Sequence, residues 1–210
     1  MRNRLAIQFA IEGDLRFISH HDSLRLFQRA LVRSGLPIRY SEGFNPRPKM
    51  RISLPRPVGV ASLAELLVLE LVSDEDPAGV LSRLSAQIPE GMRLLSAEKL
   101  ADRDRRLPSE VQYDLELEPQ IHESVAKATL LFLSKKSFFF ERILGKSAAA
   151  RPIDIRPFVL DMTVTEDVLC WTQIVTPEGT ARVNEVLESV GLSSRDYLHR
   201  VVRRKAAYRP

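Results

Sequence analysis

The chain has 210 residues, of which 44% are hydrophobic and 28% charged, and its formal net charge is +4. This composition is typical of a globular protein with one large domain or two domains of about 100 residues each. The single cysteine, Cys170, excludes an intrachain disulfide, a cysteine-ligated zinc site and an iron–sulfur cluster.

The positive charge is concentrated near the two ends of the sequence. Residues 1–60 carry 11 Lys and Arg against four Asp and Glu, residues 61–98 carry two against seven, and residues 195–210 carry six against one. Such an asymmetry predicts a polyanionic partner, for which we expect RNA and not DNA. No apolar run is long enough for a membrane span and no leader segment precedes the first predicted strand, so we expect a cytoplasmic protein without membrane contacts.

The first half of the sequence predicts the element order β-α-β-β-α-β. Alternating apolar residues favour a strand at 5–11, and apolar residues at helical spacing favour a helix at 21–34 that Gly35 and Pro37 end. Further strands are expected at 37–41, 50–54, 64–72 and 92–97, with a second helix at 76–87. This is the order of a ferredoxin-like sandwich, which we assign to residues 1–98.

The second half predicts the same scheme after a polar linker at residues 98–108. Strands are expected at 111–117, 138–143, 156–164 and 169–176, and helices at 121–133 and 177–190. A last, basic helix is expected from 194 to 205, where it would extend a positive surface. The predicted fold is therefore α+β, with two ferredoxin-like halves in tandem and the second domain at residues 108–210.

Residues 39–60 predict an ordered binding loop. Prolines and glycines restrict or direct the backbone there, and cations and aromatics are interleaved with them: Arg39, Tyr40, Phe44, Arg47, Lys49, Arg51 and Arg56. An aromatic ring beside cations can stack on an exposed RNA base, a role we predict for Tyr40. Phe44 is expected to pack beneath the loop.

The helix before this loop carries a basic stripe. Arg25, Arg29 and Arg33 are spaced four residues apart and so share one helix face, and no acidic residue occurs from Leu24 to Ile38. We predict phosphate contacts for these arginines, with a solvated outer face as the alternative.

His20 lies at the strand-to-helix turn, next to His21. We predict that His20 contacts RNA or a protein partner, or caps the helix, and that no metal ion binds there. A catalytic alternative stays open, in which His20, Tyr40 and Lys49 supply the base, acid and cation of a metal-independent ribonuclease. No glycine-rich phosphate motif is present, so we expect no cofactor.

The chain resembles the bacterial radical-SAM-linked protein family, whose members are radical-SAM-associated domains of unknown function. The resemblance rests on four ordered blocks of sequence: residues 13–22, 26–31, 40–49, and 54–55 with 57–60. The family pattern His-Leu-Asp is here His20-His21-Asp22, so only His20 is carried over. The resemblance implies a radical SAM enzyme on a separate chain as partner, and the single cysteine means that this chain is not that enzyme.

Together these features predict a non-catalytic accessory module that presents tRNA or rRNA to a radical SAM modification enzyme. In architecture the expected fold also resembles the RAMP proteins that bind and cut CRISPR RNA, so an endoribonuclease of that type remains an alternative, as does a purely protein-docking domain. The predicted binding residues are Arg16, His20, Arg25, Arg29, Arg33, Tyr40, Glu42, Asn45, Arg47, Lys49 and Arg51.

Overall fold

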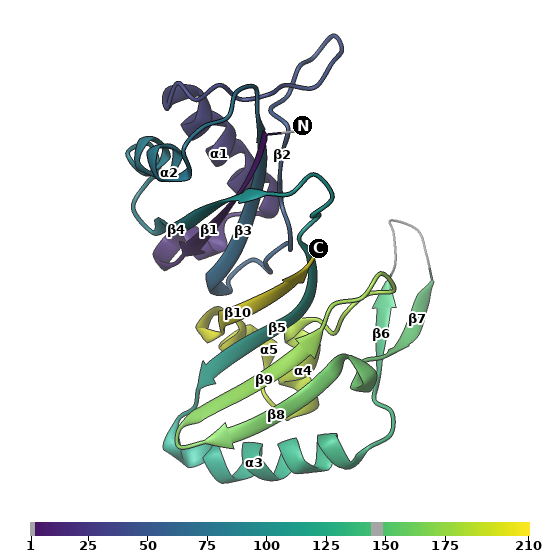
Figure 1. Ribbon diagram of the computed structural model, residues 1–210. Helices are drawn as coiled ribbons and strands as arrows, with labels where there is room; N and C mark the ends of the chain where they lie inside the picture. The colour runs from purple at the N-terminus through teal and green to yellow at the C-terminus, as the bar shows by residue number, and fades with distance from the viewer. Residues whose placement is uncertain (1–2, 144–148) are drawn as a thin grey trace. The chain divides into compact units, whose positions relative to one another are not determined.

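The computed structural model describes residues 3–143 and 149–210 (Figure 1). It is a mixed α+β fold with mostly antiparallel strands, which confirms the predicted class. The chain divides into two compact units, one made of Met1–Pro108 with Tyr208–Pro210 and the other of Ser109–Ala207. No helix in the described ranges is long and apolar enough to cross a membrane.

The first unit is built on a sheet in the order β4-β1-β3, with β2 paired to β3. Its strands are β1 (Asn3–Ile11), β2 (Met50–Ile52), β3 (Ala61–Leu71) and β4 (Met92–Leu100). All three strand pairs are antiparallel, and Leu67 of β3 lies between Ile7 and Ile52. The predicted strand at 37–41 is reduced to two isolated bridges, because its proline and the following turn interrupt the ladder.

Two helices of the first unit, α1 (His20–Arg33) and α2 (Pro77–Ser85), cover one face of this sheet (Figure 1). Ser19 Oγ accepts a hydrogen bond from the backbone N–H of Asp22 (3.1 Å), which caps α1. Phe27 on the inner face of α1 meets Phe9 of β1 edge to face, with ring centroids 4.9 Å apart. This packing leaves the arginine stripe of α1 on the outer side.

The other face of the same sheet carries a smaller apolar cluster. It consists of Ala6, Leu66, Val68 and Leu100, against which Tyr208 packs. Leu67 and Leu69 belong instead to the main core beneath the helices. Strand β3 is thus buried on both faces, which is consistent with its continuous apolar sequence.

The second unit has a sheet in the order β10-β5-β9-β8. Its strands are β5 (Leu107–Glu116), β8 (Val159–Thr165), β9 (Val168–Ile174) and β10 (Val202–Arg209), and β6 (Phe139–Ile143) pairs with β7 (Ala150–Asp154) as a separate ribbon. The helices are α3 (Pro119–Ser134), α4 (Val183–Ser189) and α5 (Ser194–Tyr197). Short 3₁₀ turns occur at Gly13–Phe17, Arg156–Phe158 and Leu198–Arg200.

Two predictions for the second unit are wrong. Residues 194–205 do not form one basic helix, because α5 ends at Tyr197 and β10 begins at Val202. The side chains explain the strand: Arg203 is buried against the Tyr113 hydroxyl (3.2 Å), whereas its neighbour Arg204 is exposed. The helix expected at 177–190 is shortened to α4, because a turn at residues 176–179 precedes it.

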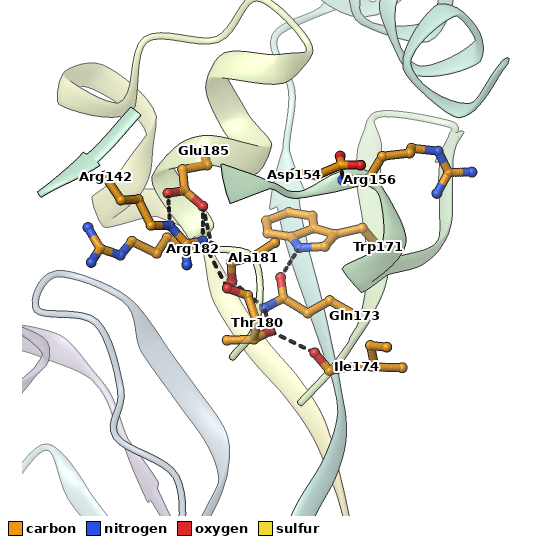
Figure 2. A network of polar contacts seen from close by, with 10 residues as sticks. All are labelled: Arg142, Asp154, Arg156, Trp171, Gln173, Ile174, Thr180, Ala181, Arg182 and Glu185. Carbon is orange, nitrogen blue, oxygen red and sulfur yellow. Dashed lines mark hydrogen bonds and ion pairs between the residues drawn. The ribbon is translucent and has the colours of Figure 1, made fainter. Parts of the chain in front are cut away.

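A buried polar network joins β6 to the start of α4 (Figure 2). Arg142 donates from Nε to Glu185 Oε1 (2.5 Å) and from Nη2 to the Thr180 carbonyl (2.9 Å). Glu185 Oε2 also accepts from the backbone N–H of Arg182 (2.8 Å), and Gln173 Nε2 donates to Thr180 Oγ1 (2.9 Å). The network therefore attaches the β6–β7 ribbon to the rest of its unit.

Candidate functional site

The excess positive charge of the protein belongs to the first unit. That unit contains 18 Lys and Arg against 13 Asp and Glu, whereas the second contains 13 against 14. Two cations of the C-terminal segment are paired within the second unit: Arg200 bonds to Glu118, and Arg204 Nε lies 2.9 Å from Asp114 Oδ2. Local carboxylates therefore neutralise part of the positive charge that we predicted for this segment.

The outer face of α1 borders a groove of about 620 Å³, which we name the arginine groove. Its wall opposite α1 is formed by residues 86–89, which follow α2. The three arginines of the predicted stripe, Arg25, Arg29 and Arg33, all line it. Asp22 is the one acidic side chain among the described residues that line this groove, so its field is positive.

The three arginines differ in how they are held. Arg25 Nη1 lies 3.1 Å from Asp22 Oδ1, and Arg33 donates from Nη2 to the Gln87 carbonyl (2.6 Å). Within the described ranges, the Arg29 guanidinium makes no hydrogen bond or ion pair and is exposed. Arg29 is thus the guanidinium of the groove that is free to receive an anion.

Asp22 is held as a carboxylate that moderates the charge of Arg25. The Ser19 hydroxyl donates to Asp22 Oδ2 (2.7 Å), and this bond, together with Arg25, lowers the pKa of the carboxyl. The carboxylate faces Arg25, and no acidic residue among the described lining of the groove compensates the charges of Arg29 and Arg33.

Residues 40–48 form an ordered hairpin between α1 and β2 (Figure 1). The backbone N–H of Ser41 donates to the Arg47 carbonyl (2.8 Å), and that of Arg47 donates to Ser41 Oγ (3.0 Å). Gly43 turns the tip with a φ of 127°, a conformation that favours glycine. The expectation that Phe44 packs beneath the loop is wrong, because the tip holds its ring fully exposed (105%).

A second groove, of about 410 Å³, lies between this hairpin and α1, and we name it the hairpin groove. Its polar lining comes from both elements: His21, Arg25 and Gln28 of α1, and Tyr40 and Arg47 of the hairpin. Arg25 lines both grooves. The predicted residues Arg25, Arg29, Arg33, Tyr40 and Arg47 are thus placed along two adjoining grooves.

The sequence interpretation missed two residues of the hairpin groove, His21 and Gln28. With Arg25 they follow the spacing i, i+4, i+7 on one side of α1, which was a usable signal. The family pattern has Leu where this chain has His21, so the resemblance gave no signal for His21.

His20 lies in a different place. It is half-buried, and it borders a small internal cavity together with Ser23, Arg56 and Glu65. Burial lowers the pKa of His20 and the adjacent His21 lowers it further, whereas Glu65 opposes the shift. Neither groove is lined by His20, so it is not grouped with Tyr40.

The remaining predicted residues line neither groove. Arg16 Nε donates to the carbonyl of Gly13 (2.9 Å), and Arg51 Nη1 donates to Ser53 Oγ (2.8 Å). Burial lowers the pKa of Arg51, with the positive charge of Arg4 adding to the shift. Glu42 and Asn45 are exposed near the hairpin tip, and Lys49 is half-buried beyond the hairpin.

In residues 3–143 and 149–210, no three His, Cys, Asp or Glu side chains lie close enough together to hold a metal ion.

In the comparison with known proteins, the chain matches a model of a bacterial protein family. A family model described as "Uncharacterized protein conserved in bacteria (DUF2344)" matches residues 4–189, which include α1, the hairpin and both grooves. No curated protein matches the chain. Because the match extends over most of the sequence, the chain belongs to this bacterial family.

Proposed function

We propose that the first unit binds RNA and presents it to a separate modification enzyme. The observation that carries this proposal is the arginine groove, in which three guanidinium groups line one face with a single carboxylate. Planar guanidinium groups match phosphate oxygens in charge and in hydrogen-bond geometry. Phosphate contacts of this kind supply most of the non-specific affinity of proteins for nucleic acid.

The arrangement of the arginines suits a chain of phosphates better than a single anion. Arg25, Arg29 and Arg33 are about one helical turn, or roughly 6 Å, apart along the axis of α1. A row of cations offers one contact after another to a phosphodiester backbone, which carries one charge per nucleotide.

We also propose that both units have a ferredoxin-like fold. The order β4-β1-β3, with β2 beyond β3, supports a ferredoxin-like first unit. If the β6–β7 ribbon is an insertion, the order β10-β5-β9-β8 supports the same plan in the second unit. Two such units in one chain would be similar to the RAMP architecture, which also handles RNA.

The partner that we propose is a radical SAM enzyme on a separate chain. It is supported by the family resemblance, whose sequence blocks lie in residues 13–60, the part of the chain that contains α1 and the hairpin. Affinity purification from the native cells should recover a protein that holds an iron–sulfur cluster with three cysteines. Recovery of RNA without such a protein would contradict the partner but not the RNA binding.

Binding of tRNA or rRNA by the full chain, measured by fluorescence anisotropy over a range of salt concentrations, tests the main proposal. We expect Arg29→Gln to weaken binding and to reduce the slope of log affinity against log salt by about one. The matched control is Lys136→Gln, an exposed cation of the second unit, which should leave both quantities unchanged. Binding that is absent at low salt, or equally insensitive to both variants, would overturn the proposal.

A further inference from the structure

We propose that the hairpin groove holds one unpaired nucleotide of an RNA strand, whose neighbouring phosphates follow the arginine groove. This inference rests on the proposed RNA binding and adds the class of RNA, which is single-stranded at the point of contact. It assigns a ligand to a groove whose α1 wall includes His21 and Gln28.

The size and lining of the groove fit a nucleotide. Its volume of about 410 Å³ is within the range of small-molecule sites, about 300 to 1,000 Å³. Tyr40 lines it and is 42% exposed, so its aromatic ring is available to a base. Stacking on an aromatic side chain is open to every base, because every base has a π face.

The polar groups around the ring can contact the base edge and the phosphates of a nucleotide. Gln28 carries an amide that can both donate to and accept from a base edge. Arg25 and Arg47 line the same groove from opposite walls and can contact phosphates on either side of the base. No acidic side chain is among the described residues that line it.

The hairpin wall is ordered before a ligand arrives. Two hydrogen bonds between Ser41 and Arg47 close it, and Tyr40 forms a bridge with Pro48. Pro46 and Pro48 restrict the backbone on either side of Arg47. Binding therefore costs little ordering of the protein.

The two grooves adjoin at Arg25, and this arrangement favours single-stranded RNA. Arg25 lines both, so a strand whose base enters the hairpin groove can continue with its phosphates toward Arg29. In a duplex the bases are paired and stacked on each other, and their faces cannot reach the ring of Tyr40. The two grooves together thus favour a strand with an unstacked base.

The test compares a labelled oligouridine with the duplex that it forms with oligoadenosine, using anisotropy and the full chain. We expect tighter binding of the single strand. Tyr40→Ala should weaken single-strand binding between about fivefold and about 150-fold, the effect of losing one base stack, and leave duplex binding unchanged. Tyr40→Phe retains the ring and should bind as the parent protein does.

Phe17→Ala is the matched control, because Phe17 is another exposed aromatic of the first unit (55%) and lines neither groove. Equal binding of single strand and duplex, with Tyr40→Ala silent and Arg29→Gln still harmful, would overturn this inference and leave RNA binding standing. Competition by uridine monophosphate at concentrations similar to those of the oligonucleotide would overturn it in favour of a free nucleotide. Absence of all RNA binding would overturn both proposals.

Discussion

Arg56 is a cation of the basic segment 39–60 that stabilises the fold instead of facing solvent. Its side chain is buried (9% exposed) and donates to main-chain carbonyls, including those of Arg16 (2.6 Å) and Ile18 (3.2 Å). These carbonyls belong to the turn and loop that lead into α1. A rigid fork of donors can satisfy several acceptors at once, which an ammonium on a flexible stem cannot do.

We expect Arg56→Lys to lower the free energy of unfolding by about 3 kcal/mol, because at least two buried or part-buried carbonyls lose a charged donor. Urea denaturation followed by circular dichroism measures this change. Arg39→Lys, at an exposed position of the same segment, should change it by less than about 0.5 kcal/mol. Similar values for the two variants would show that the Arg56 contacts contribute little.

For individual cations, the sequence predicted some positions in the fold but not others. Arg29 and Arg56 are both cations of the basic N-terminal region, yet one is exposed in a groove and the other is buried. The helical period of α1 predicted that Arg29 is exposed. No local sequence pattern predicted the burial of Arg56, because its hydrogen-bond acceptors include residues up to 41 positions earlier in the chain.

At the scale of elements, the β6–β7 ribbon depends on a contact far away in sequence. A two-stranded ribbon is marginally stable alone. Here the buried pair of Arg142 and Glu185, with side chains 10% and 4% exposed, ties β6 to α4 (Figure 2). Removing one member of such a pair leaves the other charge buried without compensation.

We expect Glu185→Gln to destabilise the protein by about 3 kcal/mol and to speed amide hydrogen exchange in β6 and β7. Hydrogen exchange with mass spectrometry locates the effect. The control is Glu123→Gln, which removes an exposed ion pair with Lys127 and should cost less than about 1 kcal/mol. Unchanged exchange in the ribbon would mean that other contacts hold it.

At the scale of the whole molecule, residues 101–106 connect the last strand of the first unit to β5. Two arginines of the first unit hold this segment: Arg4 Nη2 donates to the Ala101 carbonyl (2.6 Å), and Arg51 donates to the Arg105 carbonyl. Arg51 was predicted as an RNA contact, and these bonds support a different role. Of its neighbours on β2, Ile52 belongs to the main core and Met50 packs against it.

We expect Arg51→Gln to increase the rate of tryptic cleavage at Arg103 or Arg105, because the shorter side chain releases the connecting segment. The rate is followed by electrophoresis and mass spectrometry of the native protein. RNA affinity should stay as in the parent protein, since Arg51 lines neither groove. Unchanged cleavage together with a marked loss of RNA affinity would instead support Arg51 as an RNA contact.

The sequence alone determined the features that depend on local periodicity. It predicted the α+β class, strands β1 and β3, and helix α1 with Arg25, Arg29 and Arg33 on one face. These are properties of neighbouring residues, since a helix repeats every 3.6 residues and a strand every two. The ordered basic loop at residues 39–60 was also predicted, because proline and glycine act locally, but its hairpin at residues 40–48 was not.

Only the tertiary structure decided which side chains share a surface. It placed Tyr40 and Arg47 opposite His21 and Gln28, and it placed the half-buried His20 beside Glu65 at a small cavity. It also turned the expected C-terminal helix into β10, where Arg203 is buried against Tyr113. Each of these results depends on contacts between distant parts of the chain, and such contacts override local preference when burial and strand pairing yield more free energy.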